Sequence, residues 1–356
     1  MRGRISVIVA ASLLVVVGLL SRGVSADDGV IKHVVKPHET DPALDEVPEI
    51  QYHYAWLDPD ARPKRKLLVF LPGTGTPPSA CQLLQREAAQ LGYHVVGLMY
   101  QNTVALATIC PSAANPDACF ENARLEILDG VDRTSDDRIK VDAANSIENR
   151  LTKLLQRLVE LFPDEGWSHF LTHDGEPKWS HIAVSGHSQG GGEAAMIAKL
   201  RKVDRVVLLS SVPDNVPGFG APTWEVTHAT ASERYWGLAH SHDSAFNPIR
   251  ASWTALGMDA FGPAVIPEII EVPYNFTHML VTGLMPRGGL VNRNDHNSTA
   301  IDIFTPLAAD GTPLLRDAWR YLLTAHSADD DDVDDSDEDD GENSSRTFMP
   351  DAEQRH

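Results

Sequence analysis

Residues 184–192 read VSGHSQGGG and contain the spacing G-x-S-x-G, which constrains the fold of this chain more than any other feature. The segment before it, residues 181–184, ends in apolar and branched side chains, which favour a buried strand. The segment after it, residues 193–200, is rich in helix-forming residues. A serine in a tight turn between strand and helix projects its hydroxyl into open space, and glycines beside it avoid collisions in the strained turn. The pattern predicts a nucleophile, Ser188, while the alternative is a glycine-rich turn that only packs closely.

Apolar runs and helical patterns alternate along the rest of the chain. The expected strands are residues 66–71, 93–100, 204–211, 234–239 and 279–284, and the expected helices are residues 79–91, 143–162 and 314–324. Residues 101–140 contain no clear periodic pattern and are expected to form an irregular excursion. This alternation predicts an α/β protein with a doubly wound, mostly parallel sheet that has helices on both faces.

The two ends of the chain differ in composition from its centre. Arg2 and Arg4 precede an apolar run over residues 5–20, and small residues follow at 24–26, which is the pattern of a cleaved signal peptide. An apolar run of this length is short for a membrane span, and no second segment is apolar enough to cross a bilayer. We therefore expect a signal peptide over residues 1–26 and a secreted or extracytoplasmic protein. The remaining chain divides into an extended arm at 27–50, a catalytic domain at 51–325 and a tail at 326–356.

The formal net charge of −20 is concentrated in the tail, where most residues between Asp329 and Glu342 are acidic. Such a block repels itself and buries nothing, so we expect it to be disordered. A calcium loop centred on Gly341 would place Thr347 where a carboxylate is required, which excludes an EF-hand. The acidic balance argues against nucleic acid or an anionic membrane surface as a partner.

The chain has three cysteines, and secretion would permit a disulfide. Cys110 and Cys119 bracket a loop-like stretch that contains two prolines, and we favour this pair. Cys81 lies in an expected helix and would remain a buried thiol. Spacing alone does not fix the pairing.

With this order of elements and the serine turn, residues 50–325 resemble the α/β-hydrolase superfamily, in particular its esterase and lipase-like members. The resemblance implies a nucleophile, an acid and a histidine in that chain order, each after a strand. It assigns these roles to Ser188, Asp243 and His296. His296 lies between the last expected strand and the closing helix, whereas His278 precedes that strand and His326 begins the tail.

The acid has a competitor. Asp243 follows the strand that ends near residue 239, which is the position we favour, but Asp214 follows the preceding strand, where some hydrolases of this fold carry the acid. Asp259 is a more distant alternative. The resemblance also implies two backbone N–H groups that bind the oxyanion, and we assign them to Gln189 and to Thr74 in the loop PGTG.

The sequence also contains a possible metal site. His240 and His242 alternate along an extended segment next to Asp243, and a His-x-His pair with a carboxylate can hold zinc. Because no third ligand motif is evident, we expect no metal and no cofactor.

The resemblance thus implies a secreted serine hydrolase that cleaves carboxylic esters, with a small-molecule or lipid-like ester as substrate. Two other functions remain open: a non-catalytic binding protein on the same fold, and a hydrolase of thioester, peptide or polyester bonds. Five aromatic residues in the excursions over the strand ends could line an apolar substrate pocket or belong to the core: Trp224, Phe246, Trp253, Phe261 and Tyr274.

Overall fold

The structure is a computed structural model that describes residues 29–45, 52–134, 136–291 and 293–326. The expected signal peptide and nearly all of the expected tail lie outside these residues. Among the described residues, no helix is both long enough and apolar enough to cross a membrane.

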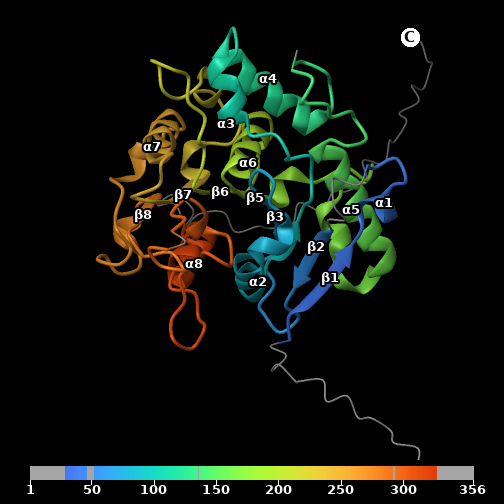
Figure 1. The fold of residues 1–356 in the computed structure, drawn as a ribbon. Helices are drawn as coiled ribbons and strands as arrows, with labels where there is room; N and C mark the ends of the chain where they lie inside the picture. The colour runs from blue at the N-terminus through green and yellow to red at the C-terminus, as the bar shows by residue number, and fades with distance from the viewer. Residues whose placement is uncertain (1–28, 46–51, 135, 292, 327–356) are drawn as a thin grey trace, which may run out of the picture.

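An eight-stranded sheet runs through the molecule in the order β1-β2-β4-β3-β5-β6-β7-β8. In Figure 1 the labelled strands run from β1 on the right to β8 on the left, and β4 is not labelled. The pairs β1/β2 and β2/β4 are antiparallel and every other pair is parallel. This confirms the expected α/β class with a mostly parallel sheet. The strands are β1 (Ile31–Val35), β2 (His53–Leu57), β3 (Leu67–Leu71), β4 (His94–Gly97), β5 (Ile182–His187), β6 (Arg205–Leu209), β7 (Tyr235–His240) and β8 (Met279–Thr282).

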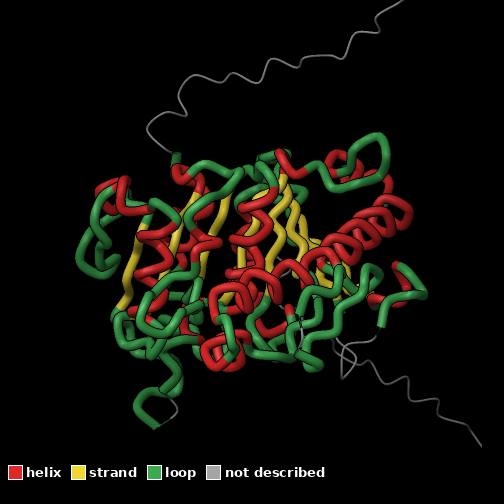
Figure 2. The backbone as a smooth tube through the Cα atoms, turned by 90° about the horizontal axis from the view of Figure 1, so that it is seen from above, coloured by secondary structure: helices red, strands yellow, loops and turns green. Residues whose placement is uncertain are grey.

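Helices cover both faces of the sheet, and Figure 2 shows the strands between them. Successive residues of each central strand face opposite sides: Leu67 and Val69 pack in one hydrophobic core, and Leu68 and Phe70 pack in the other. Helices α2 and α8 contribute to the second core, and α4 to α7 contribute to the first. The helices are α1 (Pro37–Thr40), α2 (Gln82–Gln90), α3 (Leu106–Ile109), α4 (Pro116–Asp129), α5 (Ile147–Leu161), α6 (Gln189–Leu200), α7 (Phe246–Ala255) and α8 (Arg316–Thr324).

The structure differs from the sequence-based expectations in three segments. Strand β2 was not among the expected strands. The N-terminal arm contains β1, which pairs with β2 and extends the sheet. The excursion at 101–140 contains α3 and the longer helix α4. Asn115 is the N-cap of α4, and its side chain accepts the N–H of Ala118 at 3.2 Å. A disulfide joins Cys110 to Cys119 and so ties α3 to α4, and Cys81 is a buried free thiol, as expected.

Candidate functional site

Ser188 lies between β5 and α6 with φ 53° and ψ −121°, a conformation that costs energy for any residue with a side chain. The glycines on either side make the turn possible. A Cβ on Gly190 would lie 2.1 Å from the carbonyl oxygen of Leu71, and one on Gly186 would lie 2.2 Å from the carbonyl carbon of Gly190. The sequence thus folds into the strained strand-to-helix turn that the spacing predicts, with Ser188 at its tip.

The three residues assigned as nucleophile, histidine and acid form one hydrogen-bonded chain. Nε2 of His296 lies 2.7 Å from Oγ of Ser188, and Nδ1 of His296 lies 2.7 Å from Oδ2 of Asp243. The Asp243 side chain is fully buried, while that of His296 is 27% exposed. A carboxylate accepts a hydrogen bond and cannot donate one, so Nδ1–H of His296 donates to Asp243 and Nε2 is left to accept the serine proton.

The competing acid, Asp214, lies in a different environment. Its carboxylate forms two hydrogen bonds with Arg124, from Nε at 2.8 Å and from Nη2 at 2.5 Å. Nη1 of Arg124 donates to Glu193 at 2.8 Å and to the carbonyl oxygen of Gln189 at 3.2 Å. Burial raises the pKa of Glu193 to about 8, and Arg124 only partly offsets that effect. Asp214 is therefore the partner of a buried arginine, and Asp243 is the carboxylate that contacts His296.

The competing histidines do not contact Ser188. His278 is stacked between Trp236 and Phe261, with ring centroids 3.7 Å and 4.1 Å away. Burial lowers its pKa to about 4, and its Nδ1–H donates to the carbonyl oxygen of Tyr235 at 2.9 Å. His326 lines a separate surface cavity. The packing of His278 makes it a core residue.

The two proposed oxyanion donors come from adjacent segments that contact each other. Oγ of Thr74 donates to Oε1 of Gln189 at 2.9 Å. The N–H of Gln189 is in the first turn of α6, where backbone N–H groups have no acceptor within the helix. The Thr74 loop is held by Asn102, whose Nδ2 donates to the carbonyl oxygens of Gly73 and Thr76 at 2.7 Å and 2.9 Å.

His187, which precedes Ser188, contacts the backbone of His296. Its Nε2–H donates to the backbone carbonyl oxygen of His296 at 3.1 Å, and the two rings lie 5.1 Å apart. Burial, followed by the nearby His296, lowers the pKa of His187 to about 3. His187 is therefore neutral near pH 7 and acts as a hydrogen-bond donor that fixes the loop of the proposed base.

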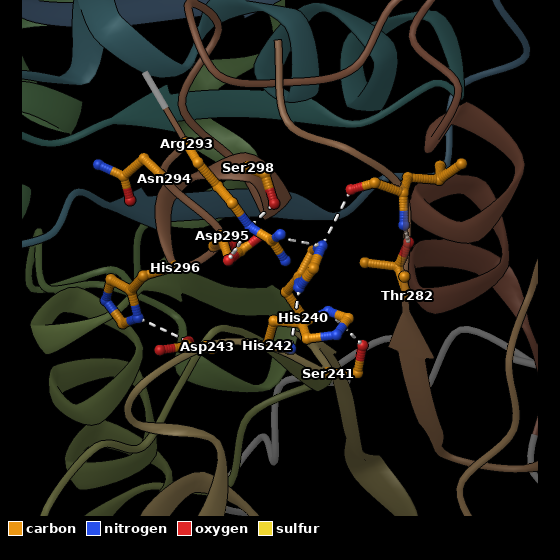
Figure 3. A network of polar contacts seen from close by, with 12 residues as sticks. His240, Ser241, His242, Asp243, Thr282, Arg293, Asn294, Asp295, His296 and Ser298 are labelled. Atoms are coloured by element: carbon orange, nitrogen blue, oxygen red, sulfur yellow. Dashed lines mark hydrogen bonds and ion pairs between the residues drawn. The ribbon is translucent and has the colours of Figure 1, made fainter. Parts of the chain in front are cut away.

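A further contact joins the turn that carries Asp243 to the loop that carries His296 (Figure 3). His240, at the end of β7, has its Nδ1 accepting the N–H of His242 at 3.1 Å, which leaves the proton on Nε2. Nε2–H donates to the carbonyl oxygen of Leu284 at 2.9 Å and lies 3.3 Å from Oδ1 of Asp295, the residue before His296. Arg293 donates to the other oxygen of Asp295 at 2.7 Å. His240 therefore connects the segments that carry Asp243 and His296.

We expect His240→Ala to lower kcat on a small ester by about 10- to 100-fold with little change in KM, because small displacements of reacting groups have effects of that size. The matched control is His242→Ala. His242 is exposed, and its ring contacts the Ser241 hydroxyl at 3.3 Å. Steady-state kinetics on both variants check the prediction, and equal rates for the two would contradict it.

The side chains of the possible metal site at His240 and His242 are bonded to other protein groups. His240 and His242 have ring centroids 5.6 Å apart, and both nitrogens of His240 already have protein partners. Within the described ranges, no group of three or more His, Cys, Asp or Glu side chains is arranged to hold a metal ion.

A cavity of about 210 Å³ opens beside Ser188. It is lined by Thr74, Ala105, Leu106, Ala107, Arg124, Ser188, Gln189, Pro213, Asp214, Ser244, Ala245 and His296. The five aromatic residues considered as a pocket are not among these lining residues. Trp224, Trp253 and Tyr274 are buried in the cores. Phe246 packs against the first core, and Phe261 stacks on His278. The space next to Ser188 is lined instead by small side chains together with Leu106, Gln189, His296 and the Arg124–Asp214 pair.

Sequence reasoning did not identify Arg124, Asn102 or His187 as parts of the site, and it considered His240 only as a possible metal ligand. Arg124 had a detectable signal, because it lies on the same face of α4 as Phe120, Ile127 and Leu128. An arginine on an apolar helix face has to find buried partners. The third glycine after Ser188 was a second signal, since a Cβ on Gly192 would lie 2.2 Å from Cζ of Arg124.

The chemistry of this site follows from its geometry: a strained serine, a histidine within proton-transfer distance, and a buried carboxylate behind it. Comparison with known proteins adds no assignment to these contacts. No family model matches the chain, and no curated protein matches it.

Proposed function

We propose that this protein is a serine hydrolase that cleaves carboxylic esters through an acyl-enzyme on Ser188. The observation that carries the proposal is the hydrogen-bonded chain Ser188–His296–Asp243, with 2.7 Å at each contact. A serine hydroxyl is a weak nucleophile near pH 7, and an adjacent base oriented by a third group is the arrangement that activates it. A binding protein would need neither this series of hydrogen bonds nor the strained conformation of Ser188.

In the proposed first step, Nε2 of His296 takes the Ser188 proton as Oγ forms a bond to the ester carbonyl carbon. The carbonyl electron pair moves onto oxygen, where the N–H groups of Gln189 and Thr74 stabilise the negative charge. Asp243 stabilises the imidazolium that forms. The carbonyl then re-forms, the bond to the alcohol oxygen breaks, and that oxygen takes the proton from His296. Water repeats the sequence on the acyl-enzyme and releases the acid.

We also propose that the fold is that of the α/β-hydrolases. The serine follows β5, the acid follows β7 and the histidine follows β8, and this is the chain order of that superfamily. All three strands belong to the parallel part of the sheet, so these residues meet at one edge. This finer assignment accounts for the position of each proposed catalytic residue.

Export of the protein is proposed from residues 1–26, which have the composition of a signal peptide. The exported chain would then begin at Asp27. N-terminal sequencing checks this directly, and an exported chain that begins at Met1 would contradict it.

The proposed function predicts a burst with p-nitrophenyl acetate. If acylation is faster than deacylation, about one nitrophenolate per folded enzyme is released before the slower steady state. Stopped-flow absorbance on the purified protein measures it, and the same protein unfolded in denaturant is the control. Release no faster from the folded protein than from the control would rule out ester hydrolysis at this site.

A further inference from the structure

The cavity beside Ser188 is small and mostly apolar. Its volume of about 210 Å³ is below the range of about 300–1,000 Å³ that is usual for sites of drug-sized ligands. Residues 105–107 form one wall, and Pro213 and Ala245 contribute to the lining. Leu106 is the largest apolar side chain among the lining residues, and it is 1% exposed. Leu106 is therefore the apolar lining side chain whose truncation would enlarge this space most.

The wall that carries Leu106 is fixed to the rest of the site. The N–H of Leu106 donates to Oε1 of Gln189 at 3.2 Å, the same atom that accepts from Thr74. At the other end of α3, the disulfide between Cys110 and Cys119 joins the wall to α4. Any outward movement of the wall would break the bond to Gln189.

Helix α4 is in turn held against α6. Arg124 of α4 is fully buried and contacts Asp214, Glu193 and the carbonyl oxygen of Gln189. Breaking such a buried ion pair typically costs several kcal/mol. The walls of the cavity therefore belong to elements that cannot easily separate to make room for a longer chain.

The charges that line the cavity are already paired. Arg124 and Asp214 form a two-point ion pair, so neither has its charge free for a charged substrate. The remaining lining consists of apolar residues, the hydroxyls of Thr74 and Ser244, and Gln189, next to Ser188 and His296. This environment favours an uncharged group.

Of the two parts of an ester, the acyl group is the one that must fit this space. It stays bonded to Oγ of Ser188 after the alcohol leaves, close to the N–H groups of Gln189 and Thr74. The leaving oxygen takes its proton from Nε2 of His296, whose side chain is 27% exposed, and so departs on the side that meets solvent.

We propose that Ser188 accepts short, uncharged acyl groups, from acetyl to butyryl, and that Leu106 sets this limit as a specificity-determining residue. The proposal rests on the ester hydrolysis proposed above. It narrows the substrate class from esters in general to esters of short-chain acids.

The test is a series of p-nitrophenyl acetate, butyrate and octanoate with the whole enzyme. We expect kcat/KM for butyrate to exceed that for octanoate by at least about tenfold, since each misfit of a few methylenes has effects of this size. Leu106→Ala should change the octanoate-to-butyrate ratio by about tenfold in favour of octanoate. Leu151→Ala is the matched control, because Leu151 is equally buried in the same core on α5 and does not line the cavity.

The outcomes separate this inference from the proposed function. Equal rates for octanoate and butyrate in the unaltered enzyme overturn the inference and leave ester hydrolysis intact. The inference is also overturned, with ester hydrolysis intact, if Leu106→Ala and Leu151→Ala have the same octanoate-to-butyrate ratio of kcat/KM. Thermal unfolding checks that both variants are folded. No turnover of any of the three esters by folded protein contradicts the proposed function itself, and the inference falls with it.

Discussion

Replacing Ser188 by alanine is expected to lower kcat on p-nitrophenyl acetate by about 10⁵- to 10⁶-fold. The variant lacks the oxygen that we propose forms the acyl-enzyme, and removing the nucleophile of a comparable triad has an effect of this size. Alanine has the same Cβ strain as serine at φ 53° and is smaller, so the fold should tolerate the substitution. Steady-state kinetics measure the loss, and circular dichroism checks the fold.

Ser185→Ala is the matched control for this experiment. Ser185 lies on β5, three residues before Ser188, is fully buried, and donates to the carbonyl oxygen of Val207 at 3.0 Å. We expect it to lose some stability and to keep its rate within a few-fold. If Ser188→Ala keeps more than a tenth of the activity, the hydrolysis occurs elsewhere in the sample or through another residue.

Replacing Asp243 by asparagine should lower kcat by about 10⁴-fold. An amide can donate to Nδ1 of His296, which would place the imidazole proton on Nε2, where it cannot accept the serine proton. Asp243 also accepts the N–H of Ala245 at 2.8 Å, and asparagine can keep that contact through its carbonyl oxygen. The loss should therefore appear in kcat far more than in stability.

Asp214→Asn distinguishes the two carboxylates. It removes one charge of a buried pair and leaves Arg124 with Glu193 as its remaining carboxylate, so we expect the free energy of unfolding to fall by about 3 kcal/mol. Its kcat should fall much less than that of Asp243→Asn. Denaturant unfolding and kinetics on the two variants check this, and a larger loss of kcat in Asp214→Asn would show that the acid was assigned to the wrong carboxylate.

The central part of the fold could be predicted because its signals are local. Each buried parallel strand is a short apolar run, and β5 with the glycine-rich turn and α6 is contiguous in the sequence. Once the strands are parallel, residues that follow them meet at one edge, so Ser188, Asp243 and His296 could be expected near one another.

The edge strand β1 and the helix α4 were harder to predict. Strand β1 is only five residues long, has no regular polar–apolar alternation, and becomes a strand by pairing with β2. Helix α4 carries Arg124 and Glu126 on buried positions, which weakens the apolar face by which a helix is recognised. Both segments depend on tertiary partners that are distant in the sequence.

The supporting contacts of the site could not be predicted for the same reason. His240 contacts Leu284 and Asp295, and His187 contacts the backbone of His296, more than 40 and 100 residues further along the chain. No local pattern distinguishes these histidines from His242, which is exposed. Their roles follow only from the packing of β5, β7 and the loop after β8.

The most direct test of the central claim is reaction with a fluorophosphonate probe, followed by mass spectrometry of the digested protein. The probe forms a stable bond with a serine only where the hydroxyl is activated by a base and the oxyanion is stabilised. We expect one adduct, on Ser188, and no adduct in the Ser188→Ala variant. A folded protein that is not labelled, or that is labelled on another serine, would contradict the proposal that Ser188 is the nucleophile.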